Sequence, residues 1–314
     1  MKNMMKKTNL SMLEIYEYFK QELKENHTIQ LEVLNPDFGL DLYCGETVYQ
    51  ENTKYIYRSY KSYTDLAEIF GCKLLTPKMV SKYTVLLKFK KLEDKQSFHS
   101  KSYDDTKEKY GVSSSFFKIS KNEEPSFLHY YKQALENAKV TEKRKILNLG
   151  INKGDEFELI KDILPYENIL DKSFVGVDFS ESVIKYAKKR FNTSNFTFYN
   201  HDINTLEQLS LGKFDLIISI GTLQSSSLNF KEVFMSLIQN HLEDSGSIIL
   251  GFPNCRWKNY EMIYGAKVPN YSFSEQSLLY KDVYFCKKYL QQKRFRVTIT
   301  GKNYIFLTAT SIKK

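Results

Sequence analysis

The stretch that most constrains the fold is residues 146–155, where a short apolar run leads into a turn with two glycines and then into the start of a helix. Gly150 and Gly154 stand where the backbone must bend sharply and where a ligand can come close, which glycine allows because it has no Cβ atom. The N–H groups at the start of the following helix can face a polar ligand group. The stretch therefore predicts a strand, a ligand-binding turn and a helix in direct succession.

Segments that favour strands and segments that favour helices alternate from residue 145 onward. The predicted strands are residues 146–149, 174–178, 196–202, 214–220 and 247–252, and the predicted helices are 155–163, 181–191 and 230–241. Such alternation is typical of a parallel sheet with helices on both faces. The last two predicted strands, 294–300 and 304–310, have only residues 301–303 between them. That link is too short for a parallel crossover, so these strands must form an antiparallel hairpin.

This order of elements resembles the class I S-adenosylmethionine-dependent methyltransferases over about residues 145–311. The first motif of that family, an acidic residue followed by Gly-x-Gly-x-Gly, corresponds to residues 148–154, with Asn148 in place of the acid and Asn152 in place of the middle glycine. Asparagine accepts through its carbonyl oxygen and tolerates positive φ, and Asp155 is a further acid nearby. The resemblance implies an α/β fold with a Rossmann-like seven-stranded sheet, made of five parallel strands and an antiparallel C-terminal hairpin.

The resemblance also implies which residues bind the cofactor, S-adenosyl-L-methionine. Asp178, at the end of the second strand, stands where the family binds the ribose hydroxyls, and a carboxylate can accept from both. Phe179 would flank the adenine, and Asp202 stands where an acidic residue of the family meets the adenine amino group. The full set implied for the cofactor is Asn148, Gly150, Asn152, Gly154, Asp178, Phe179, Asp202, Ile203 and Gly221.

A dinucleotide-binding domain is the alternative for such a turn, but its fingerprint requires a third glycine in a G-x-G-x-x-G spacing. The turn at residues 150–155 lacks that glycine.

Chemistry is expected beyond the fourth and fifth strands, because ligands of open α/β sheets bind outside the carboxyl ends of the strands. Residues 221–226 lack the Asn/Asp-Pro-Pro-aromatic motif of the family's adenine-N6 enzymes, which disfavours that chemistry.

Cys255 is the single candidate for a catalytic residue. It follows the fifth strand, and pyrimidine C5 methyltransferases use a cysteine nucleophile. Packing is the commoner role of a lone cysteine. The four cysteines are widely separated and lack metal-ligand spacing, so the sequence predicts reduced thiols and no zinc site.

The chain is predicted to have three parts, because 314 residues exceed what one hydrophobic core usually organises. Residues 1–105 are expected to form a smaller α+β domain, with helices at 11–24 and 63–70 and strands at 31–34, 43–57 and 84–90. Residues 106–144 are expected to be a helical linker with a helix at 126–138, and residues 145–314 the methyltransferase domain. An insertion at residues 253–292 carries Trp257, Tyr260, Tyr264, Lys267, Tyr271 and a helix at 275–292, where Ser272 and Glu275 have capping-box spacing.

Two features bear on the methyl acceptor. Aromatic rings alternate with cations at Tyr55, Tyr57, Arg58, Tyr60, Lys61 and Tyr63, a pattern that suits base stacking in single-stranded nucleic acid. Tyrosines on a half-buried strand more often pack in a core. The net charge of +9 lies wholly in residues 255–314, which hold 12 Lys and Arg against 3 Asp and Glu. The basic residues expected near the site mouth are Arg256, Lys258, Lys267, Lys287, Lys288, Lys293, Arg294 and Arg296.

A basic segment of this kind can contact phosphates, although charge runs are also often solvated faces. RNA, as transfer or ribosomal RNA, is therefore the first expectation for the acceptor. A small molecule is the second, and a non-catalytic protein that binds S-adenosylmethionine is the third, because the first motif is altered. The sequence has no apolar run of about 18 residues, so a cytoplasmic protein without a membrane partner is expected.

Overall fold

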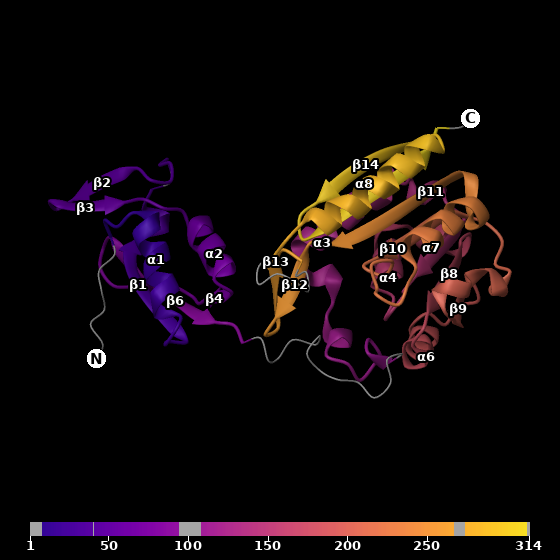
Figure 1. Cartoon of the computed structure of the whole chain (residues 1–314), viewed down its shortest axis with the longest axis horizontal. Coiled ribbons are helices and arrows are strands. Elements are labelled where there is room, and N and C mark those ends of the chain that lie inside the picture. The colour runs from indigo at the N-terminus through magenta and orange to yellow at the C-terminus, as the bar shows by residue number, and fades with distance from the viewer. Residues whose placement is uncertain (1–7, 40, 94–107, 267–273, 313–314) are drawn as a thin grey trace. The chain divides into compact units, whose positions relative to one another are not determined.

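The computed structural model describes residues 8–39, 41–93, 108–266 and 274–312 (Figure 1). The chain divides into two compact units. The N-terminal unit comprises Met1–Ser97 with Trp257–Ile263, and the C-terminal unit comprises Phe98–Arg256 with Tyr264–Lys314.

The N-terminal unit is a small antiparallel sheet covered by two helices. Its elements are α1 (Met12–Glu22), β1 (Thr28–Leu34), η1 (Pro36–Phe38), β2 (Thr47–Gln50), β3 (Thr53–Ile56), α2 (Tyr60–Ile69), β4 (Cys72–Leu74), β5 (Lys78–Met79) and β6 (Thr84–Lys91). Strand β6 lies between β1 and β4 and also pairs with β5, while β2 and β3 form a separate pair. Both predicted helices and the predicted strand regions are confirmed, whereas β4 and β5 were not predicted.

Helix α1 begins where its sequence provides a capping box. The Ser11 hydroxyl accepts from the Glu14 N–H at 3.2 Å, and the Glu14 carboxylate accepts from the Ser11 N–H at 2.7 Å. These two bonds satisfy N–H groups that a helix start otherwise leaves unpaired. The apolar stripe that follows places Ile15 and Phe19 in a core with α2 and the sheet.

Three of the four tyrosines that suggested base stacking are part of the interior of this unit, whereas Tyr60 is 39% exposed. Tyr55 and Tyr57 are buried in a small cluster with Leu34, and Tyr63 is fully buried between α1, α2 and the sheet. Rings in these positions cannot stack on bases. The packing interpretation of this segment is therefore the correct one.

The C-terminal unit is built on one seven-stranded sheet. Its elements are η5 (Phe116–Lys118), η6 (Lys121–Glu123), α3 (Pro125–Asn137), η7 (Val140–Glu142), β7 (Lys145–Leu149), α4 (Asp155–Ile163), α5 (Tyr166–Leu170), β8 (Ser173–Asp178), α6 (Glu181–Arg190), β9 (Phe196–Asn200), η8 (Ile203–Leu209), β10 (Phe214–Ile220), α7 (Phe230–Ser236), η9 (Leu237–His241), β11 (Leu242–Pro253), α8 (Ser277–Gln292), β14 (Phe295–Gly301) and β15 (Tyr304–Ser311). The strand order is β14-β15-β11-β10-β7-β8-β9. Strands β7 to β11 are parallel, and β15 is antiparallel to both β11 and β14. The predicted sheet and its C-terminal hairpin are confirmed.

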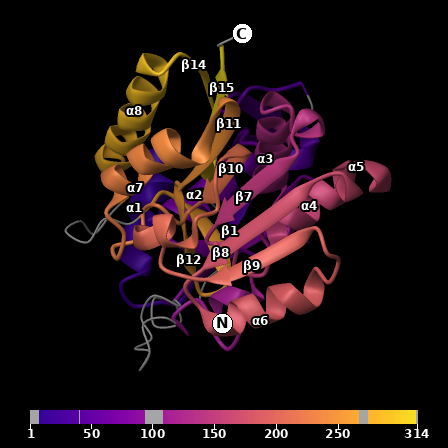
Figure 2. The ribbon, with the colours of Figure 1, turned by 90° about the vertical axis from the view of Figure 1, so that its right-hand side faces the viewer.

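Helices cover both faces of this sheet (Figure 2). Helices α7 and α8 pack Val233, Phe234 and Cys286 onto the face that carries Leu147 and Leu149 of β7. On the other face, Phe157 of α4 contacts the rings of Phe174 and Phe196, and Phe127 of α3 contacts Phe306. Because β7 and β10 are covered on both faces, they are continuous apolar runs, as parallel strands usually are.

The insertion differs from the prediction. It contains a two-stranded sheet of β12 (Cys255–Lys258) and β13 (Glu261–Tyr264), which the sequence did not indicate. Helix α8 begins at Ser277 with Gln276 as N-cap and no side-chain cap, so the predicted capping box is wrong. Lys267, Tyr271 and Ser272 lie outside the described residues. Within the described ranges, no helix is long and apolar enough to cross a membrane.

Candidate cofactor and acceptor site

The turn after β7 takes the conformation that its glycines allow. Gly150 has φ +72°, Asn152 has φ 45°, and Gly154 caps α4 at φ +88°. A Cβ atom on Gly150 would lie 2.0 Å from the Thr222 hydroxyl oxygen, and one on Gly154 would lie 2.4 Å from the Phe191 ring. These contacts show that the two glycines serve close packing as well as backbone conformation. Asn152 adopts the positive φ expected of it.

Asp178, the last residue of β8, receives backbone hydrogen bonds on both carboxylate oxygens. The Asn152 N–H donates to Oδ2 at 2.9 Å, and the Ser180 N–H donates to Oδ1 at 3.0 Å. Burial raises the pKa of Asp178, the backbone donors lower it, and the nearby Glu108 charge raises it further, for a net increase. Each oxygen keeps a lone pair that can accept from a ligand hydroxyl.

Residues 179, 202, 203 and 221 follow the carboxyl ends of β8, β9 and β10. Phe179 directly follows Asp178 and is 43% exposed, which is unusual for a ring and leaves a face for a flat ligand. Asp202 caps η8, where its Oδ1 accepts from the Asn204 N–H at 2.9 Å. Ile203 is buried in the sheet core, and Gly221 follows β10 with φ +73°.

Buried polar atoms without a partner gather at the carboxyl ends of β7, β10 and β11. Asn148 is 1% exposed, and neither its Oδ1 nor its Nδ2 has a hydrogen-bond partner in the part of the chain that the structure describes. The other unpaired atoms in this region are Ser219 Oγ, Gln224 Oε1, Asn254 Oδ1 and Asn303 Oδ1. Buried polar groups almost always have a partner, so this edge of the sheet is suited to a polar ligand. It fits the amino acid part of S-adenosylmethionine, whose ammonium and carboxylate need acceptors and donors.

Asp155, considered above as a substitute acid, has other partners. Its carboxylate lies 3.4 Å from Arg190 Nη1 and 3.8 Å from Lys153 Nζ, and Lys121 N–H also donates to it. The neighbouring Glu156 is buried and pairs with Lys121 Nζ at 2.7 Å. Both carboxylates therefore hold the start of α4 in place, and the expectation that Asp155 faces the ligand is wrong.

The segment of residues 108–123 is tied to this site at both ends. At one end the Glu108 carboxylate accepts from the hydroxyls of Ser180 and Ser182 at the start of α6. At the other end Lys121 and Asn122 bind the start of α4. We call this segment the strap.

The strap also binds the glycine-bearing turn directly. Between its two ends, the Tyr110 carbonyl accepts from the Asn152 side chain at 3.0 Å. Burial raises the pKa of Glu108, but the hydroxyls of Ser182 and Ser180 and two backbone N–H groups lower it more, so its pKa falls below the usual value. Glu108 thus stays ionised close to Asp178. The sequence analysis missed this role, because the strap has no helical or strand periodicity.

No obvious general base lies at the acceptor end among the described residues. The side chains that follow β10 and β11 are Thr222, Gln224 and Asn254, which are neutral. Cys255 is buried at the start of β12 beside Tyr304. Burial raises the pKa of Tyr304, so this phenol stays protonated.

Five of the basic residues expected near the site mouth lie away from this edge. Phe295 of β14 pairs with Ser311, while Gly301 pairs with Ile305 beside the end of β11. Lys293, Arg294 and Arg296 are therefore at the amino ends of the parallel strands, opposite the site. The C-terminal half of α8, which carries Lys287 and Lys288, leads toward the same end. Arg256 is held by its bonds to Tyr264 O and Gly265 O at 3.0 and 2.6 Å. The expectation that the basic group lies near the site mouth is therefore wrong for Lys287, Lys288, Lys293, Arg294 and Arg296, whereas Arg256 follows the carboxyl end of β11.

Comparisons with known proteins agree with this architecture. Residues 140–296 match a family described as "Methyltransferase domain". A malonyl-[acyl-carrier protein] O-methyltransferase from Bacillus cereus is 36% identical over 106 residues, which cover 33% of this chain and 36% of that enzyme. The chain thus matches about a third of the length of this curated relative.

Solved structures with a similar fold are more distant in sequence. The plantazolicin methyltransferase BpumL, determined with a monoazolic desmethylPZN analogue and SAH, has 13% identity and a TM-score of 0.44 over 62% of this chain and 88% of that one. A putative methyltransferase in complex with the Haloferax volcanii Trm112 methyltransferase activator has 11% identity and a TM-score of 0.41, over 62% and 93% of the two chains.

Proposed function

This chain belongs to the class I S-adenosylmethionine-dependent methyltransferase family, and we propose that it methylates a carboxylate on a small or carrier-bound acyl acceptor. The proposal rests mainly on one observation, which is that the acceptor end of the site offers neutral amides and hydroxyls and no general base among the described residues. A carboxylate is ionised at neutral pH. It needs no proton removed before it attacks.

Residues at the ends of β7, β8 and β9 would hold the cofactor. In this proposal Asp178 accepts from the ribose hydroxyls, Phe179 covers one face of the adenine, and Asp202 and Ile203 border it. Asn148 meets the amino acid part, and the turn of Gly150, Asn152 and Gly154 contacts the ligand through its backbone. The bound cofactor supplies an electrophilic methyl group on a sulfonium.

The protein's own contribution to catalysis would be alignment and exclusion of water. Holding a nucleophile in line with the reacting carbon can supply about 7–11 kcal/mol of the barrier. Gln224, whose side-chain oxygen has no partner among the described residues, can turn its amide group to donate to an acceptor carboxylate, whereas the Asn254 amide already donates to the Lys302 carbonyl oxygen at 3.1 Å. The strap, bound at both ends, would cover the cofactor from solvent.

The curated relative supports an acyl acceptor, because it is named as an O-methyltransferase of malonyl-[acyl-carrier protein]. Its match covers only about a third of its length, so the acceptor of this chain is proposed from the site and not transferred from the name. We assign acceptor recognition to the N-terminal unit and to the insertion, which lie outside the cofactor-binding turns.

RNA is the second candidate, and its support is the net charge of +9 carried by residues 255–314. Lys288, Lys293, Arg294 and Arg296 are exposed on α8 and around the start of β14. Such a surface can hold phosphates at a distance from the reacting centre. If RNA is the acceptor, its binding should weaken steeply with salt, with a slope of about −0.7 per phosphate contacted.

One labelling experiment separates these acceptors. The full-length protein is incubated with methyl-labelled S-adenosylmethionine and either acyl carrier protein loaded with dicarboxylic acyl groups, a pool of small carboxylic acids, or bulk RNA. A methyl ester releases its label as volatile methanol in mild alkali, whereas methyl groups on a base or ribose stay in the RNA. Alkali-volatile label supports the proposal, and label that remains in RNA refutes it.

A further inference from the structure

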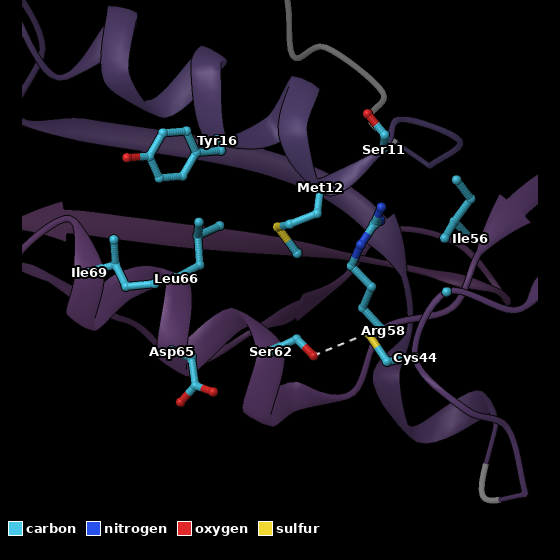
Figure 3. Close-up of a pocket in the computed structure, with 11 residues that line it drawn as sticks. Ser11, Met12, Tyr16, Cys44, Ile56, Arg58, Ser62, Asp65, Leu66 and Ile69 are labelled. Atoms are coloured by element: carbon cyan, nitrogen blue, oxygen red, sulfur yellow. Dashed lines mark hydrogen bonds between the residues drawn. The ribbon is translucent and has the colours of Figure 1, made fainter.

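The N-terminal unit has a pocket of about 560 Å³ between α1, α2 and the loop before β2 (Figure 3). This volume is within the range of sites for small molecules, roughly 300–1,000 Å³. Its lining combines apolar side chains of α1 and α2 with the buried Arg58. All of the lining residues belong to the N-terminal unit, so this pocket is distinct from the cofactor-binding turns of the C-terminal unit.

A buried arginine forms part of the pocket wall. Arg58 is 4% exposed, and its Nη2 donates to the Leu10 carbonyl oxygen at 2.6 Å. Its guanidinium also forms a side-chain hydrogen bond with the buried Tyr63, and burial raises the pKa of that phenol, so Tyr63 stays neutral. A guanidinium has five N–H donors. Both of these partners are neutral, so neither balances the charge of the guanidinium.

No carboxylate compensates this charge in the part of the chain that the structure describes. The one acidic residue that lines the pocket, Asp65, binds Lys61 Nζ at 2.8 and 3.0 Å on the exposed side of α2. A buried cation without a counter-charge is costly, because burial removes its hydration. A bound anion would remove that cost.

We propose that this pocket binds a small carboxylic acid with an apolar body, the carboxylate resting on Arg58. The planar guanidinium matches a carboxylate with two parallel hydrogen bonds. One arginine balances one negative charge, which favours a carboxylate over a doubly charged phosphate. The Ser62 hydroxyl also lines the pocket, 3.5 Å from Cys44 Sγ, and can add a polar contact (Figure 3).

The rest of the lining is apolar and suits the body of such a ligand. Met12 and Tyr16 come from α1, and Leu66 and Ile69 come from α2. Ile69 is 69% exposed and Tyr16 is also exposed, although both border the pocket. Exposed apolar side chains around a buried charge are typical of a site whose ligand covers them.

The test uses the full-length protein and three six-carbon probes, namely hexanoate, hexanamide and hexyl phosphate, with affinities measured by ligand-observed NMR. Hexanoate should bind at least roughly tenfold more tightly than hexanamide, because only the ionised probe forms charge-assisted bonds with Arg58. Equal binding of acid and amide refutes the role of Arg58. Tighter binding of hexyl phosphate than of hexanoate refutes the carboxylate assignment.

Two matched surface variants locate the binding without disturbing the buried arginine. Ile69→Asp adds a negative charge at the pocket and should weaken hexanoate binding by roughly fivefold. Leu13→Asp makes the same change on α1, at a residue that is also 69% exposed but does not line the pocket, and should leave binding unchanged. The proposal is wrong if both variants bind hexanoate as tightly as the unmodified protein does. It is also wrong if the unmodified protein binds none of the three probes. These results do not depend on the methyl acceptor.

Discussion

Replacing Asp178 with asparagine should weaken cofactor binding much more than it weakens the fold. The two carboxylate oxygens accept from Asn152 N–H at 2.9 Å and Ser180 N–H at 3.0 Å. An amide has one oxygen, so its NH₂ group must face one of these N–H groups, and the charge offered to the ribose is lost. Hydrogen bonds to a charged group contribute about 1.5–3 kcal/mol. The expected loss is therefore roughly 10- to 150-fold in Kd.

The affinity is best measured by isothermal titration calorimetry with S-adenosylhomocysteine and the full-length protein. Asp162→Asn is the matched control, because Asp162 is an exposed carboxylate on α4 and the chemical change is the same. Thermal unfolding reports separately on the fold. The raised pKa of Asp178 shows that burial disfavours its charged form, so a neutral side chain removes that cost and offsets part of the lost hydrogen bonding.

The reasoning fails if Asp178→Asn binds S-adenosylhomocysteine as tightly as the unmodified protein. It also fails if Asp162→Asn loses as much affinity, because the effect would then be a general one of charge. A large fall in melting temperature with unchanged affinity would make Asp178 a structural residue and not a ligand of the ribose.

Two further predictions concern the same turns. Gly150→Ala should lower the free energy of unfolding, measured in urea, by more than the approximately 1–2 kcal/mol expected for left-handed backbone alone. The additional loss arises because the new Cβ would lie 2.0 Å from Thr222. Gly212→Ala is the control, because Gly212 has nearly the same φ but open space around it, and it should show only the backbone cost. Cofactor affinity should fall as pH drops through the raised pKa of Asp178, because the ribose hydroxyls need the ionised carboxylate. Glu108→Gln removes a negative charge that raises the pKa of Asp178, so this variant should lose cofactor affinity at a lower pH than the unmodified protein does. Binding titrations over a pH series measure this shift. An unchanged pH profile would contradict the interaction between Glu108 and Asp178.

Much of the C-terminal unit could be predicted from sequence because its signals are local. Each parallel strand is an apolar run, and the short link at residues 301–303 forces the hairpin of β14 and β15. Helix α4 was predicted with the bounds that it has, since Gly154 at positive φ ends the turn before it. Local sequence patterns of this kind need no knowledge of distant contacts.

The features that were missed depend on tertiary contacts or on unusual turns. The strap owes its position to side chains at its ends, Glu108 and Lys121, whose partners lie about 35 to 74 residues away in the sequence. The turn between β12 and β13 has Asn259 at φ 45° and Tyr260 at φ 69°. Glycine is the residue expected at the second of these positions, so the sequence carried little hairpin signal.

The placement of the basic residues could not be predicted from their number. Their excess in residues 255–314 is a property of the sequence, but their position depends on the direction of α8 and on the register of β14. Because β14 pairs antiparallel with β15, Lys293 and Arg296 lie at the amino ends of the parallel strands, opposite the candidate site. Charge counting alone therefore indicated the wrong part of the molecule.

The central claim is that the cofactor binds at the carboxyl ends of β7 to β9, and photo-cross-linking tests it most directly. The full-length protein is irradiated with methyl-labelled S-adenosylmethionine, digested, and the labelled peptide is identified by mass spectrometry, with excess S-adenosylhomocysteine as competitor. We expect the label, suppressed by the competitor, on the peptide that contains Phe179 or on the one that contains Ile203. Competitor-sensitive label confined to residues 8–93 would contradict the account.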